Sequence, residues 1–79
     1  MKLKYKEVQA LKYELGQLIN TNPTQGNLEI ENITSNTMAY FVKLFKVEKP
    51  NHKLTIASLF YFIDNYLDDA YIIKGVDLL

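Results

Sequence analysis

The sequence predicts an all-α fold, a small three-helix bundle. Apolar residues recur with helical spacing in three segments, and turns containing proline or glycine separate these segments. Of the 79 residues, 48% are hydrophobic and 23% are charged, which is a balance typical of a globular chain. We expect residues 1–79 to form a single helical domain, because this length is near the lower limit for unaided folding.

The first two helices are expected at residues 4–19 and 35–48. The first has a narrow apolar stripe, although Gly16 weakens its last turn by about 1 kcal/mol. Thr34 is the expected N-cap of the second helix, which Pro50 ends because the residue before a proline avoids the α region. Ile33 is expected to pack on Met38 as a hydrophobic staple. The stripe of the first helix consists of Val8, Leu11, Leu15, Leu18 and Ile19.

The third helix, expected at residues 54–74, gives the strongest helical signal. Thirteen of the eighteen residues 56–73 are aliphatic or aromatic, and most fall on one broad arc of a helical wheel. This apolar arc consists of Leu59, Ile63, Ile56, Leu67, Phe60, Tyr66 and Ala70. Lys74 and Gly75 suit the end of the helix, since a cation favours the negative end of its dipole and glycine the C′ position.

Residues 28–33 alternate between apolar and polar side chains, which is a strand signal. A strand needs a partner, and the tail at residues 75–79 is the candidate that we identify. A short two-stranded β element from these two segments is therefore one alternative. The other, which we favour, is an extended loop.

Composition and motifs give no sign of an enzyme. The chain has no cysteine, which excludes disulfides, thiolate zinc sites and a cysteine nucleophile. It also lacks a glycine-rich phosphate loop, a GxSxG motif and an HExxH motif. His52 is the single histidine, and nothing local offers it a catalytic or metal-binding partner. We expect no catalytic residue, no cofactor and no metal.

Charge and composition also bear on location and origin. The N-terminus has no continuous apolar region, and acidic residues interrupt residues 54–73, so we expect a soluble, cytoplasmic protein. The formal net charge is zero, yet residues 38–53 are basic and residues 54–79 are acidic. All nine basic residues are lysines, and residues with AT-rich codons are abundant. This composition suggests a phage, a mobile element or another AT-rich genome.

We interpret the chain as a small protein-protein interaction module, a regulator or inhibitor that binds and occludes a host or phage protein. The third helix has a wide apolar face, which predicts a homodimer with Phe62 and Ile73 exposed near its edge. The acidic face of that helix is a candidate contact for a basic partner. The expected partner-binding residues are Tyr61, Phe62, Asp64, Asp68, Asp69 and Ile73.

A DNA-binding regulator is the alternative function. The middle of the chain loosely resembles a helix-turn-helix repressor, with a helix after Thr34-Ser35 and a second one from Leu54. The resemblance implies that the helix at 35–48 enters the DNA groove, presenting Asn36, Tyr40, Lys43 and Lys46. The short turn with its usual glycine is missing. The chain also has no arginine for base readout, so we expect no specific nucleic-acid partner. We expect no membrane partner either, because acidic residues lie within the long apolar stretch at 54–73.

Overall fold

The computed structural model describes the backbone of residues 4–71 and the side chains of residues 4–67. In order along the chain, the helices are α1 (Tyr5–Thr21), the 3-10 helix η1 (Pro23–Asn27), α2 (Asn36–Glu48) and α3 (Ile56–Tyr71). The all-α prediction with three α-helices is confirmed for the described residues. The predicted end of the third helix at Lys74 and Gly75 lies outside them.

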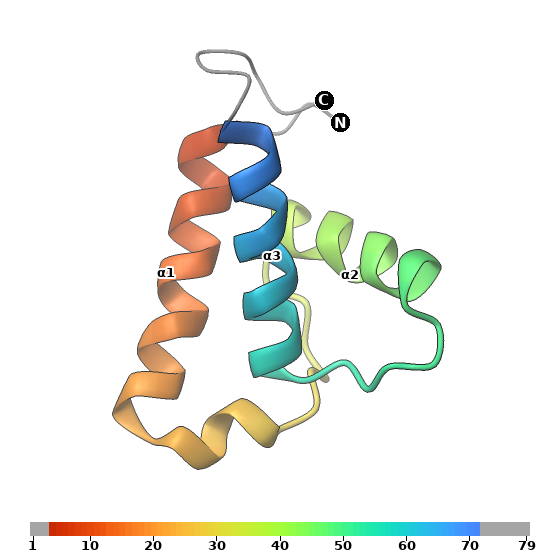
Figure 1. The fold of residues 1–79 in the computed structure, drawn as a ribbon. Coiled ribbons are helices and arrows are strands. Elements are labelled where there is room, and N and C mark those ends of the chain that lie inside the picture. Colours follow the sequence, from red (N-terminus) through yellow and green to blue (C-terminus); the bar gives the residue numbers. More distant parts are fainter. Residues whose placement is uncertain (1–3, 72–79) are drawn as a thin grey trace.

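The helices α1 and α3 lie side by side and run in opposite directions, while α2 crosses at a steep angle (Figure 1). The 3-10 helix η1 follows α1 and also packs against α3. Buried apolar side chains from all three α-helices meet in one core cluster. This cluster consists of Val8, Leu11, Leu15, Met38, Phe41, Val42, Phe45, Leu59, Phe62, Ile63 and Leu67.

The apolar arc of α3 is covered from two sides. Leu59 and Ile63, at the centre of the arc, have no exposed surface. On the flank toward α2, the Phe62 ring packs edge-on against Phe45, with 5.3 Å between ring centroids. The expectation that Phe62 is exposed is therefore wrong, because α2 covers it and leaves its side chain 9% exposed. Ile73, the other expected edge residue, lies outside the described residues.

The N-cap of α2 is Ser35 and not Thr34. The Ser35 hydroxyl accepts a hydrogen bond from the Met38 amide at 3.1 Å, and its backbone is extended, as a cap requires. Thr34 instead donates its hydroxyl to the Met38 sulfur at 3.7 Å. The expected staple is not supported, because Ile33 is one residue too early for this cap and stays 52% exposed.

A reciprocal cap also sets the start of α3, two residues later than predicted. The Ser58 amide donates to the Thr55 hydroxyl at 3.1 Å, and the Thr55 amide donates to the Ser58 hydroxyl at 2.8 Å. This pair resembles a capping box with serine in place of the usual Glu or Gln. It satisfies two amides at the helix start, so Leu54 remains in the preceding loop.

The two-stranded element expected from residues 28–33 and 75–79 is not supported. The described residues contain no strand, only an isolated antiparallel bridge between Glu29 and Thr55. Two hydrogen bonds flank it, from the Ile30 amide to the Leu54 carbonyl at 3.1 Å and from the Ile56 amide to the Leu28 carbonyl at 3.0 Å. The alternating segment therefore pairs with the turn before α3, and residues 75–79 lie outside the described part.

Aromatic rings join α2 to α3 beside the core. The Phe41 ring packs edge-on against Tyr66 of α3 and against Tyr40, its neighbour in α2. Burial raises the pKa of the Tyr66 hydroxyl, and the neighbouring Tyr40 raises it further through its charge and a hydrogen bond. The neutral form of Tyr66 is therefore favoured in the folded chain.

The cap assignment predicts unequal effects of two neighbouring substitutions. Ser35→Ala should lower the free energy of unfolding by about 1 kcal/mol, because the Met38 amide loses its acceptor. Thr34→Ala should cost less, since its hydroxyl makes only a weak bond to sulfur. Urea denaturation followed by circular dichroism measures both, and a larger loss for Thr34→Ala would contradict the assignment.

The tyrosine pair predicts a loss of stability at alkaline pH. The folded-state pKa of Tyr66 lies above its unfolded value near 10, so the unfolded chain releases this proton first as pH rises. The stabilisation from the neutral Tyr66 hydroxyl is fully present below the unfolded-state pKa. It is lost as pH rises from that value through the folded-state pKa. Between about pH 9 and 11, the urea midpoint should fall more steeply for the natural chain than for Tyr66→Phe. Equal slopes would contradict this account.

Candidate functional site

The contact between α1 and α3 follows a regular antiparallel register. Lys12 faces Asp64, and four residues further along α1 Gly16 faces Phe60, which lies four residues earlier in α3. Residues spaced by four lie on one face of a helix, so each helix presents one stripe to the other. These two contacts link α1 and α3 beside the core.

Gly16 permits the helices to approach closely at Phe60. A Cβ atom built at Gly16 would lie 3.1 Å from the Phe60 Cε1, closer than side-chain carbons normally pack. The ring therefore lies against the backbone of α1. A glycine inside a helix lowers its stability by about 1 kcal/mol relative to alanine. The contact with the Phe60 ring gives a physical reason why glycine occupies position 16 despite this loss.

Lys12 holds two groups of α3 at once. Its ammonium pairs with the Asp64 carboxylate and lies 5.9 Å from the centroid of the Phe60 ring. The two charged side chains are about one-third exposed, so the ion pair and the cation–π contact are each worth at most about 1 kcal/mol. Their main consequence is positional, because they hold Phe60 and Asp64 against α1.

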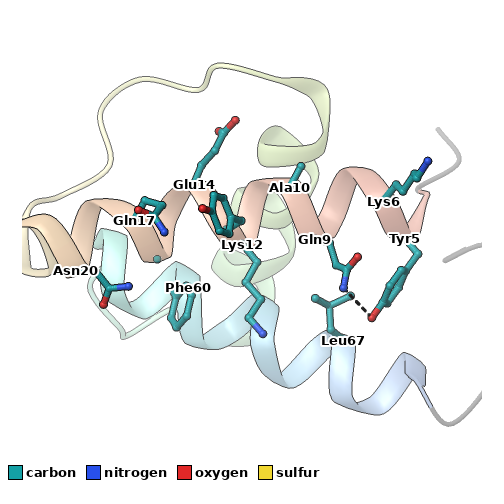
Figure 2. Close-up of a pocket in the computed structure, with 12 residues that line it drawn as sticks. Tyr5, Lys6, Gln9, Ala10, Lys12, Glu14, Gln17, Asn20, Phe60 and Leu67 are labelled. Atoms are coloured by element: carbon teal, nitrogen blue, oxygen red, sulfur yellow. Dashed lines mark hydrogen bonds between the residues drawn. The ribbon is translucent and has the colours of Figure 1, made fainter.

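An open groove of about 970 Å³ lies on the surface along this contact, and we name it the α1/α3 groove. Figure 2 shows Phe60 and Leu67 on α3 and Lys12 reaching toward α3 from α1. The Gln9 amide donates to the Tyr5 hydroxyl at 3.2 Å near one end. The other residues that line the groove are Lys6, Ala10, Tyr13, Glu14, Gly16, Gln17 and Asn20.

Two exposed tyrosines border the same contact. Tyr13 lines the groove and is 67% exposed, and Tyr61 is 60% exposed. The Tyr61 ring packs edge-on against Phe60, with 5.2 Å between centroids. Each of the two helices therefore places one exposed tyrosine in or beside the groove, near the amide and charged groups of its lining.

The structure brings together only some of the residues predicted to bind a partner. Tyr61 lies next to the groove, whereas Phe62 is in the core on the other flank of α3. Asp64 pairs with Lys12 of the same chain, so its charge is already compensated. Asp68 and Asp69 belong to α3, but their side chains, like all of Ile73, lie outside the described part.

Residues of α1 that line the groove were missed, because the helical pattern assigned them only to solvent. Tyr13 carried the one available signal, since a large aromatic ring stands on the polar side of that helix. No local pattern indicates that Gly16 and Phe60 meet, because they come from elements far apart along the chain. The groove could not be predicted without the packing of α1 on α3.

The described residues match neither the pattern of a metal site nor that of a membrane span. They contain no group of three or more histidine, aspartate or glutamate side chains that could hold a metal ion. His52 is exposed in the loop between α2 and α3. In the described part of the chain, no helix is both long and apolar enough to cross a membrane. No family model matches the chain, and the comparisons with curated proteins and with solved structures find no match either.

The close approach at Gly16 predicts an effect that depends on Phe60. Gly16→Ala should give little or no stabilisation in the natural chain, because the helix-propensity gain of about 1 kcal/mol is offset by the contact with the ring. In a Phe60→Leu background the ring atoms are gone, so the same substitution should recover most of that gain. Urea denaturation of all four proteins gives the coupling energy. Equal effects in the two backgrounds would contradict the contact.

Proposed function

We propose that this chain is a small non-enzymatic protein-interaction module that binds another protein through the α1/α3 groove and the adjoining tyrosines. It acts by covering the surface of its partner, as a cytoplasmic regulator or inhibitor. The observation that carries the proposal is the presence of two exposed tyrosines at the groove, Tyr13 in its lining and Tyr61 packed against the lining residue Phe60.

The chemistry of this surface suits a protein partner. Tyrosines are enriched in binding hot spots, because they supply a large contact area and a hydroxyl at low entropic cost. Gln9 and Gln17 add amide groups that can hydrogen-bond a partner's backbone. The groove is open along its length, whereas small-molecule sites usually enclose most of the ligand surface. A partner's helix or loop fits such a shape better.

The regulator or inhibitor role and the phage or mobile-element origin rest on composition. A chain of 79 residues with nine lysines and no arginine is consistent with a small protein from an AT-rich genome. A homodimer stays a prediction. The wide apolar face of α3 gives less support to a dimer than its width alone indicated, because α1 and α2 pack on this face and Phe62 is buried.

A DNA-binding regulator ranks second. In its favour, Asn36, Lys43 and Lys46 of α2 are exposed. Against it, residues 22–35 precede α2 and residues 49–55 follow it, and both connections are longer than the three- or four-residue turn of a helix-turn-helix. Tyr40, the fourth expected reader, is half-buried against the core.

The proposal predicts that aromatic groove residues decide partner capture. The tagged chain should capture a protein from lysate of its source cell, and Tyr13→Ser with Tyr61→Ser should reduce the captured amount by about tenfold or more. The control is Ile33→Ser, an exposed apolar residue in the connection before α2 that belongs to neither the groove nor the adjoining tyrosines. Circular dichroism should show the same fold for every variant.

Two results would contradict the proposal. One is capture that the double tyrosine variant leaves unchanged. The other is sequence-selective binding of duplex DNA that falls steeply with salt and is abolished by Lys43→Ala with Lys46→Ala, which would favour the DNA-binding regulator.

A further inference from the structure

A second surface, on α2, has a different chemistry from the groove. Tyr40, Leu44 and Val47 are spaced i, i+4 and i+7, so they form one stripe along the helix. Tyr40 and Leu44 are half-buried against the core, whereas Val47 is 77% exposed. We name these three residues the α2 ridge. The buried residues of α2 are Thr37, Met38, Phe41, Val42 and Phe45, so the ridge extends the apolar side of the helix from the edge of the core to the solvent.

Lysines border the ridge on one flank only. Lys43 and Lys46 are three residues apart, so they project from the same side of α2, and both are exposed. Within the described residues neither makes an ion pair. Glu48, the acidic residue of α2, lies on the other flank of the ridge from Lys43 and Lys46 on the helical wheel. The positive charge along this flank is therefore not compensated by the described neighbours.

From this arrangement we propose that the α2 ridge binds an acidic amphipathic helix of another protein. The apolar side chains of that helix pack on Val47 and Leu44, and its carboxylates pair with Lys43 and Lys46. Helices commonly dock through anchors at i, i+4 and i+7, with charges along the edge giving specificity. This site lies on a different element from the α1/α3 groove, so the chain has two separate binding faces.

A protein helix matches the ridge better than a nucleic acid does. The phosphate backbone has no apolar surface to pack on Leu44 and Val47, whereas an amphipathic helix has one. DNA-reading helices gain much of their specificity from arginine and amide contacts with base edges, and the chain has no arginine. The one-sided charge also suits a helix with one acidic edge.

The test uses a fluorescent peptide of about 18 residues, long enough to form a helix, with leucines at i, i+4 and i+7 and glutamates along one edge. A matched peptide carries glutamine in place of each glutamate, and a random DNA duplex serves as the third probe. Binding to the full chain is followed by fluorescence anisotropy at low and high salt. NMR spectra of the ¹⁵N-labelled chain locate the site.

We expect the acidic peptide to bind with a Kd below about 1 mM and to shift the amide signals of residues 40–47. Val47→Ser should weaken binding about tenfold, because burial of a valine is worth roughly that factor. Lys43→Gln with Lys46→Gln should remove most of the salt dependence and most of the preference over the glutamine peptide. Tyr13→Ser with Tyr61→Ser should leave binding unchanged, which separates this test from that of the groove.

Three results would overturn the proposal. The first is no binding of the acidic peptide below about 1 mM. The second is binding that shifts the signals of the α1/α3 groove or is unaffected by Val47→Ser. The third is tighter binding of the DNA duplex than of the acidic peptide at the same salt concentration. Because Val47 is exposed, Val47→Ser should retain the fold, and circular dichroism checks this.

Discussion

The fold depends on the need to cover the wide apolar arc of α3 from two sides. Each large side chain removed from water contributes about 1.5–3 kcal/mol, and one neighbouring helix cannot reach both flanks of the arc. The helix α1 covers one flank and α2 the other, so that Leu59 and Ile63 have no exposed surface between them. The connection at residues 22–35 carries the chain from the end of α1 to the start of α2 (Figure 1), and the bridge between Glu29 and Thr55 ties it to the start of α3.

The candidate site follows from the way α1 meets α3. Gly16 brings the α1 backbone against Phe60, and Lys12 holds Asp64 one turn further along α3. The α1/α3 groove lies along this contact, and Tyr13 is one of its lining residues. Tyr61 lies beside the groove, where its ring packs against Phe60. The Phe60 ring therefore takes part in the packing of the two helices and in the surface offered to a partner. On the far flank, α2 buries its own core residues, while Tyr40 and Leu44 stay half-buried and Val47 is exposed, which gives the molecule two faces of different chemistry.

The sequence predicted the three helices because their signal is periodic and local. It did not distinguish Thr34 from Ser35 as the N-cap of α2, because the hydroxyl of either residue type can accept a hydrogen bond from a backbone amide of the first turn. The backbone conformation determines which of the two residues is the cap. It placed Phe62 at an exposed edge because the arc alone does not say which flank α2 covers. The pairing of residues 28–30 with 54–56 and the contact of Lys12 with Asp64 are non-local, so no spacing rule indicates them. The groove is a product of that non-local packing, and Tyr13 on the polar side of α1 was its one sequence signal.

The packing of the Phe60 ring on Gly16 within one chain joins α1 to α3. The most direct measurement is the nuclear Overhauser effect between the Gly16 α-protons and the Phe60 ring protons, recorded with isotope filters on a mixture of labelled and unlabelled chains. We expect a strong intramolecular signal and ring-current shifts of the Gly16 α-protons, because a Cβ there would lie only 3.1 Å from the ring. Absence of the signal, or its appearance only between labelled and unlabelled chains, would contradict the account.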